Sequence, residues 1–183
     1  MADNLGGRQA IFLVKVLQGG DTPELVGLAD KQVRRRILQE YFYVMIYRDL
    51  VERYGVGNLA ALRYVIRRLV ESVGSPVSIS KIYNDLKSAG HRIGKNTLYE
   101  YLDRLEAIYF VQLAKKFDPS IVRQELAEKK VYIIDNGYLG ALTYQHVNNY
   151  GKLLENLVAM ELIKKNQTLF LSRVNRNARP GSF

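Results

Sequence analysis

Residues 76–117 constrain the fold more than any other stretch, because two helical patterns there are followed by a short apolar strand. The first pattern repeats apolar side chains at helical spacing: Ile79, Ile82, Tyr83 and Leu86. Ser78 or Ser80 can cap the start of this helix, since a serine oxygen accepts an amide proton from the first turn. Gly90 can end it, because glycine readily adopts the left-handed conformation found at helix termini.

The second pattern predicts a helix over residues 95–107 with a buried side formed by Leu98, Tyr101, Leu102 and Leu105. The other side then faces outward: Lys95, Asn96, Tyr99, Glu100, Asp103 and Arg104. Residues 108–113 follow as a strand, and residues 129–135 form a second strand that can pair with it. Two helices joined by a short turn and followed by a β-ribbon are typical of a winged helix-turn-helix.

A long helix is predicted before this stretch, over residues 30–54, with Asp30 as its N-cap. Its apolar side chains recur at helical spacing and predict a buried stripe: Val33, Ile37, Leu38, Tyr41, Val44, Met45 and Leu50. Asn58 can cap a further helix that runs to about residue 72, with an inward side formed by Leu59, Leu62, Val65, Ile66 and Leu69. We expect this further helix to be the scaffold of the winged domain.

The segment between the two predicted strands, residues 115–130, is polar and carries five basic residues. We expect it to be the wing loop, which contacts the DNA backbone in many winged helices. Downstream, the patterns predict two helices and one strand: residues 137–144, 150–166 and 168–172. Residues 174–183 are basic and without a pattern, so we expect disorder there.

The chain carries 27 basic and 18 acidic residues, a formal net charge of +9. This surplus favours an anionic partner, most simply nucleic acid, although thermophilic surfaces also carry many cations. There is no cysteine, and the two histidines, His91 and His146, lie far apart, so we expect neither a metal site nor a cofactor. No apolar run approaches the roughly 20 residues that cross a bilayer. We also find no convincing signal peptide, and therefore expect a cytoplasmic protein without a membrane partner.

The N-terminal end of the helix over residues 95–107 is the candidate DNA-contacting element, because this end enters the major groove in winged helices. The predicted contacts are polar side chains at this end and in the wing loop: Arg92, Lys95, Asn96, Tyr99, Lys115 and Lys116. The cations can neutralise phosphates, the asparagine can pair with an adenine edge, and the tyrosine can donate to a phosphate.

Three carboxylates further along the same helix oppose this interpretation: Glu100, Asp103 and Glu106. A DNA backbone would repel them, and many winged helices bind protein instead. Docking to a protein and a purely structural role therefore stay open as alternatives to DNA contact.

Four phrases occur in order along the chain: YRDLVERYGV at 47–56, KNTLYEYL at 95–102, KVYIIDNG at 130–137, and LENLV with EL at 154–162. Together they resemble the C-terminal half of the AAA+-type ATPases common in archaea and bacteria, over about residues 18–173. In that family a P-loop ATPase module is followed by a helical lid, a winged helix and a domain related to PD-(D/E)XK nucleases. The resemblance implies the last three parts in this chain.

Two departures limit what the resemblance implies. The chain contains neither the GxxxxGK[ST] phosphate loop nor an apolar strand ending in an acidic Walker B pair, so ATP chemistry is not carried over. In the nuclease-like part, Glu155 matches the helix acid, but residues 174–178 lack the acids of the expected strand. One glutamate cannot assemble a Mg²⁺ site. We therefore expect Glu155 to be a structural cap or ion-pair residue, and a nuclease fragment ranks last among the interpretations.

The sequence thus predicts a mainly α-helical, non-catalytic protein with a small β part. The expected segments are an N-terminal segment (1–29), a lid-type helix (30–57), a winged-helix domain (58–135), a truncated nuclease-like α/β piece (136–173) and a disordered tail (174–183). The expected function is binding of double-stranded DNA. The alternative is a protein–protein interaction module that docks to an ATPase partner or to a second copy of itself.

Overall fold

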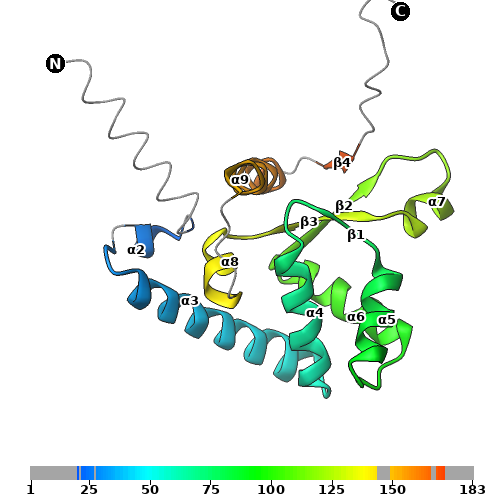
Figure 1. Cartoon of the computed structure of the whole chain (residues 1–183), viewed down its shortest axis with the longest axis horizontal. Helices are drawn as coiled ribbons and strands as arrows, with labels where there is room; N and C mark the ends of the chain where they lie inside the picture. The colour runs from blue at the N-terminus through cyan, green and yellow to red at the C-terminus, as the bar shows by residue number, and fades with distance from the viewer. Residues whose placement is uncertain (1–19, 21, 27, 144–148, 166–167, 172–183) are drawn as a thin grey trace, which may run out of the picture.

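The computed structural model describes residues 20, 22–26, 28–143, 149–165 and 168–171 (Figure 1). The protein is mainly helical with a small antiparallel sheet, which confirms the predicted fold class at this level. The predictions for His146, for the disordered tail and for most of the N-terminal segment lie outside the described residues.

The helices are α2 (Pro23–Val26), α3 (Lys31–Met45), the π-helix η1 (Ile46–Glu52), α4 (Leu59–Glu71), α5 (Ile79–Ser88), α6 (Lys95–Ala107), α7 (Ile121–Leu126), α8 (Gly137–Leu142) and α9 (Tyr150–Lys164). The strands are β1 (Pro76–Val77), β2 (Val111–Lys116), β3 (Lys129–Ile133) and β4 (Phe170–Leu171). The sheet order is β1-β3-β2-β4. β1 and β2 flank β3 antiparallel, and β4 runs parallel to β2.

The two central helices have the ends that the sequence predicts. The side chain of Ser78 caps α5 by accepting from the Lys81 amide at 3.3 Å, and Gly90 follows α5 with φ 82°. α6 covers the predicted residues, and its buried side chains are the predicted ones: Leu98, Tyr101, Leu102 and Leu105. Local patterns suffice here because both helices bury one continuous apolar side.

The first long strand begins at Val111, so the prediction of a strand from residue 108 is wrong. The amides of Tyr109 and Phe110 instead donate back to the carbonyls of Glu106 and Leu105, at 2.9 and 3.1 Å. Tyr109 adopts φ 59°, the left-handed conformation that closes a helix. Residues 108–110 therefore end α6, and the apolar pattern there reflects the burial of Phe110.

The predicted buried stripe of the long N-terminal helix is confirmed for four of its seven members and wrong for three. Leu38 and Leu50 are buried, and Ile37 and Met45 are partly buried against the main core. Val33, Tyr41 and Val44 are instead 45–54% exposed. α8 packs against the inner side of α3, and Figure 1 shows α3 along an edge of the molecule. The apolar stripe is wider than the surface that α8 and its neighbours cover. The single predicted helix is also two elements, because a π-helix follows Met45.

One hydrophobic core joins the described segments. It contains Leu38 of α3, Leu69 of α4, Leu105 of α6, Ile133 of β3 and Leu153 of α9. Residues 30–57, 58–135 and 136–173 therefore contribute to the same core. Figure 1 shows α9 on one side of the sheet and α4, α5 and α6 on the other.

A buried side-chain amide joins the end of β3 to α9. Asn156 is 1% exposed and accepts from the Ile133 amide while donating to the Ile133 carbonyl, both at 2.9 Å. It also donates to the side-chain oxygen of Asn136 at 3.0 Å, and Asn136 donates to the Leu153 carbonyl at 2.9 Å. Asn156 thus satisfies both backbone groups of Ile133, as a neighbouring strand would.

A second group of hydrogen bonds joins the N-terminal residues to the segment that follows β3. The Asp135 carboxylate accepts from the amide and hydroxyl of Thr22, at 2.9 and 2.6 Å, and from the Gly137 amide at 2.6 Å. Gly20 lies so close that a Cβ atom there would sit 1.9 Å from the carboxylate. The phrase KVYIIDNG is therefore a structural junction of three chain segments.

Asn156→Ala is expected to lower the free energy of unfolding by about 3 kcal/mol, because it leaves the buried Ile133 and Asn136 groups unpaired. Urea unfolding monitored by circular dichroism measures the loss. Asn84→Ala, at an exposed position of α5, is the matched control and should change stability by less than about 0.5 kcal/mol. Equal effects from the two substitutions would show that the Asn156 network is not a stabilising junction.

Candidate nucleic-acid interface

The N-terminal end of α6 presents three of the predicted contact residues together. Arg92, Lys95 and Asn96 are all exposed, and their side chains form no hydrogen bond or ion pair with another described residue. The N-cap of α6 is Gly94, which provides no side-chain hydrogen bond to the first turn. Because the first amides of a helix carry a partial positive charge, they add to the field of the two cations.

Tyr99 lies one turn further along α6 and is partly buried. Its side chain packs against the main core, so its position relative to Asn96 is fixed by packing. Lys95, Asn96 and Tyr99 therefore lie on the first turns of α6, and Arg92 lies in the segment just before it. The prediction that the Tyr99 side chain faces outward is only partly met, because the core covers part of it.

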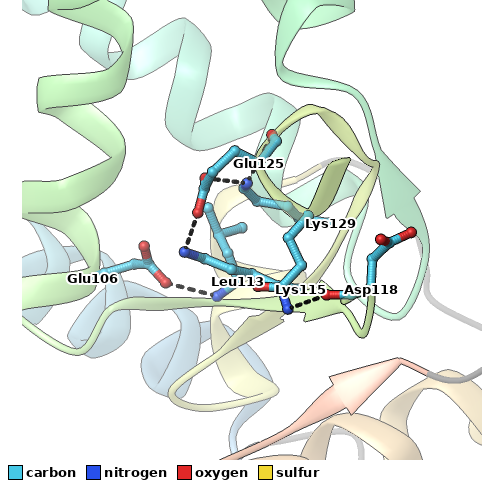
Figure 2. Close-up of polar contacts among 7 residues, drawn as sticks. Glu106, Leu113, Lys115, Asp118, Glu125 and Lys129 are labelled. Atoms are coloured by element: carbon cyan, nitrogen blue, oxygen red, sulfur yellow. Dashed lines mark hydrogen bonds and ion pairs between the residues drawn. The ribbon is translucent and has the colours of Figure 1, made fainter. Parts of the chain in front are cut away.

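The three carboxylates that opposed DNA contact have different surroundings. Glu106 is half-buried and turns toward β2, where it accepts from the Leu113 amide at 2.9 Å (Figure 2). Burial raises the pKa of Glu106, and hydrogen bonding to Leu113 partly offsets that rise. Glu100 lies 3.8 Å from Arg104 in an ion pair, and Asp103 is exposed. Glu106 is thus withdrawn from the outer side of α6.

The predicted wing loop is a compact segment that contains α7. Lys115 pairs with Glu125 at 2.5 Å, and Lys129 donates to the same carboxylate at 3.1 Å (Figure 2). Hydrogen bonds from Lys115 and then Lys129 lower the pKa of Glu125. Lys115 is therefore already paired within the wing. Lys116 follows on β2 and is partly buried.

α7 also exposes apolar side chains that the sequence interpretation of a polar loop missed. Ile121, Val122 and Leu126 are 66–79% exposed. Phe117 contacts Phe170 edge to face, with ring centroids 5.9 Å apart. The signal was present in the sequence as IVxxxL at helical spacing, between flanking charges that dominated the composition.

Glu155 is an ion-pair residue, as predicted. It pairs with Lys130 and accepts from the Tyr132 hydroxyl at 2.8 Å. Burial and the neighbouring Glu155 carboxylate raise the pKa of Tyr132. Within the described part of the chain, no three His, Asp or Glu side chains gather as a metal site would require. In that same part, no helix is long and apolar enough to cross a membrane.

Comparison with known proteins shows the family. Residues 13–149 match the family described as a domain of unknown function, DUF8612, and the chain belongs to this family. An uncharacterized protein of Methanocaldococcus jannaschii is 30% identical over 163 residues, which cover 87% of this chain and 36% of the relative. An uncharacterized protein of Haemophilus influenzae is 30% identical over 156 residues, covering 85% of this chain and 39% of the relative.

The chain therefore spans between a third and two fifths of the length of these curated relatives. No solved structure matches the chain significantly. The match to the family covers residues 13–149, and the fold described above is the structure of most of these residues.

Glu106→Gln is expected to gain stability over the wild type as the pH rises from about 4 to 7. The raised pKa means that folded Glu106 holds its proton more tightly than unfolded Glu106, whose ordinary value is 4.5. The contribution of protonated Glu106 to the free energy of unfolding is therefore fully present below pH 4.5, and it is lost as the pH rises through the pKa of the folded state. Glutamine keeps an acceptor for the Leu113 amide and does not ionise.

Thermal unfolding at several pH values gives the difference between the two melting temperatures. Glu100→Gln, on the outer side of the same helix, controls for the loss of one negative charge from α6. A melting-temperature difference that is independent of pH would contradict the assignment of Glu106 as a carboxyl group penalised by burial.

Proposed function

We propose that this protein is a winged-helix module that binds double-stranded DNA through the N-terminal end of α6. The order and pairing of the elements support this assignment. The order is α4, β1, α5, α6, β2 and β3, with the short α7 between β2 and β3, and β1 and β2 flank β3 in the sheet. In this arrangement α4 is the scaffold, α6 the recognition helix and residues 117–128 the wing.

The observation that carries the proposal is the group of exposed Arg92, Lys95 and Asn96 at a helix end without a side-chain cap. Phosphates bind at such ends because free amides and cations act on the same anion. In this proposal Asn96 contacts a base edge and Tyr99 a phosphate. The withdrawal of Glu106 and the pairing of Glu100 with Arg104 reduce the repulsion that the sequence alone suggests.

Among the wing residues, Lys116 is the stronger candidate for a phosphate contact. Lys115 already pairs with Glu125, so contact with DNA would require it to exchange one anion for another. We therefore assign the main electrostatic contribution to α6 and a smaller one to the wing.

The resemblance to AAA+-type ATPases extends this proposal to domain organisation. Residues 30–57 would be the lid-type helix, residues 58–135 the winged helix, and residues 136–173 a truncated nuclease-like piece. The module is non-catalytic and cytoplasmic in this proposal. Because the curated relatives are longer, the unit would serve there as the DNA-binding part of a larger protein.

A second candidate function is docking to a protein, and the exposed apolar side of α7 favours it. Ile121, Val122 and Leu126 face solvent at the tip of the wing, where a DNA-contacting wing usually carries cations. The charged residues around them pair with one another, as Lys115 does with Glu125. An ATPase of the resembled family is one partner of this kind.

The double substitution Arg92→Glu and Lys95→Glu is expected to weaken binding of a fluorescent DNA duplex by about 100-fold, through loss of two phosphate contacts. The slope of log affinity against log salt should fall by about two. Lys115→Glu should have a smaller effect because Lys115 is already paired. Fluorescence anisotropy across a salt series measures the affinity of each variant and the slope of its salt dependence.

The control compares two single variants: Lys31→Glu makes the same charge change as Lys95→Glu alone, but at the start of α3, which Figure 1 shows far from α6. If the wild type showed no salt-sensitive binding at micromolar concentration, the DNA proposal would fail and the docking function would remain. Equal losses from Lys31→Glu and Lys95→Glu would indicate only nonspecific attraction by net charge.

A further inference from the structure

The outer side of α3 and η1 is an unusually apolar exposed surface. Its large side chains are Val33, Tyr41, Tyr43, Val44 and Tyr47, each at least 45% exposed. The rings of Tyr43 and Tyr47 stack with centroids 6.2 Å apart and planes 10° apart. Single exposed apolar residues are common, but a row along one helix marks an interaction surface. We call these five residues the α3 face.

Two charged residues of opposite sign, Arg36 and Glu40, lie beside the α3 face. At about 100° per residue, Arg36 and Glu40 lie on the same side of α3 as Val33 and Val44. Both are exposed, and no ion pair with another described residue engages either of them. Arg36 is nearer the start of α3 and Glu40 nearer its end.

Two copies of this surface are complementary in charge only when their α3 helices run antiparallel. If two copies pack α3 against α3 in opposite directions about a two-fold axis near Leu38, Arg36 of each copy faces Glu40 of the other. The same axis places Val33 opposite Tyr43 of the second copy. A parallel pair would instead place Arg36 against Arg36 and Glu40 against Glu40. An isologous interface has this property by symmetry, since each contact occurs twice.

We propose that the occupant of the α3 face is a second copy of this chain, packed antiparallel through α3. The apolar side chains supply the association, and the two Arg36–Glu40 pairs select the direction. α3 lies along an edge of the molecule in Figure 1, so a second helix can approach it without moving the core. This inference does not rest on DNA binding, because it uses a different surface and a different measurement.

The test is a charge exchange followed by sedimentation or light scattering over a range of concentrations. The wild type is expected to form a dimer of twice the 21.0 kDa of one chain. Arg36→Glu and Glu40→Arg should each weaken dimerisation by about tenfold or more, because each creates two like-charged pairs. The double variant Arg36→Glu with Glu40→Arg should restore the wild-type affinity. Because Arg36 and Glu40 are four residues apart on one helix, the exchange also restores a pair within one chain, so the melting temperature of each variant is measured as well. A dimer affinity that merely followed the melting temperature would overturn the proposal.

Arg63→Glu is the control, since Arg63 is exposed on α4 and the charge change equals that of Arg36→Glu. It should leave dimerisation unchanged, and circular dichroism checks that every variant is folded. Three further results would overturn the proposal: a monomer at every concentration, a dimer insensitive to both single variants, or a double variant that remains weak. Association only with the additional part of a longer relative would also overturn it, by showing a different occupant.

Discussion

The pairing of the Asn156 amide with both backbone groups of Ile133 holds the described structure together at its centre. β3 lies between β1 and β2, so the position of β3 sets the whole sheet. Without Asn156 the end of β3 would bury an amide and a carbonyl that no strand pairs, at a cost of about 1–3 kcal/mol for each group. Because Asp135 and Asn136 follow directly, the same junction also fixes α8 and the segment at Thr22.

The position of β2 in turn determines the charge on α6. The Leu113 amide donates its hydrogen bond to the Glu106 carboxylate, which is thereby turned away from solvent. In the wing, Glu125 is held by Lys115 and Lys129. Contacts with β2, β3 and the wing thus engage the charged side chains of Glu106, Glu125, Lys115 and Lys129, which composition alone cannot show. Arg92 and Lys95 are exposed at the N-terminal end of α6, while Glu100 and Asp103 are exposed further along the helix.

Two surfaces therefore differ in character within one small family unit. The end of α6 is cationic and polar, whereas the outer side of α3 is apolar with two exposed charges of opposite sign. We propose phosphates and base edges as the partners of the first surface and another helix as the partner of the second. Both lie within residues 13–149, the part of the chain that matches the family. A dimer through α3 would carry two α6 ends, an arrangement that many DNA-binding proteins use to contact two half-sites.

The sequence by itself determined the features that depend on neighbours within a few residues. The cap at Ser78, the turn at Gly90 and the buried side of α6 follow from local hydrogen bonding and helical periodicity. Only the tertiary structure decided which apolar and charged side chains are covered. Val44 fits a buried pattern but α8 covers the other side of α3, and Glu106 turns inward because Leu113 lies beside it. Burial and pairing depend on contacts between residues distant in sequence, and periodicity contains no information about which elements provide them.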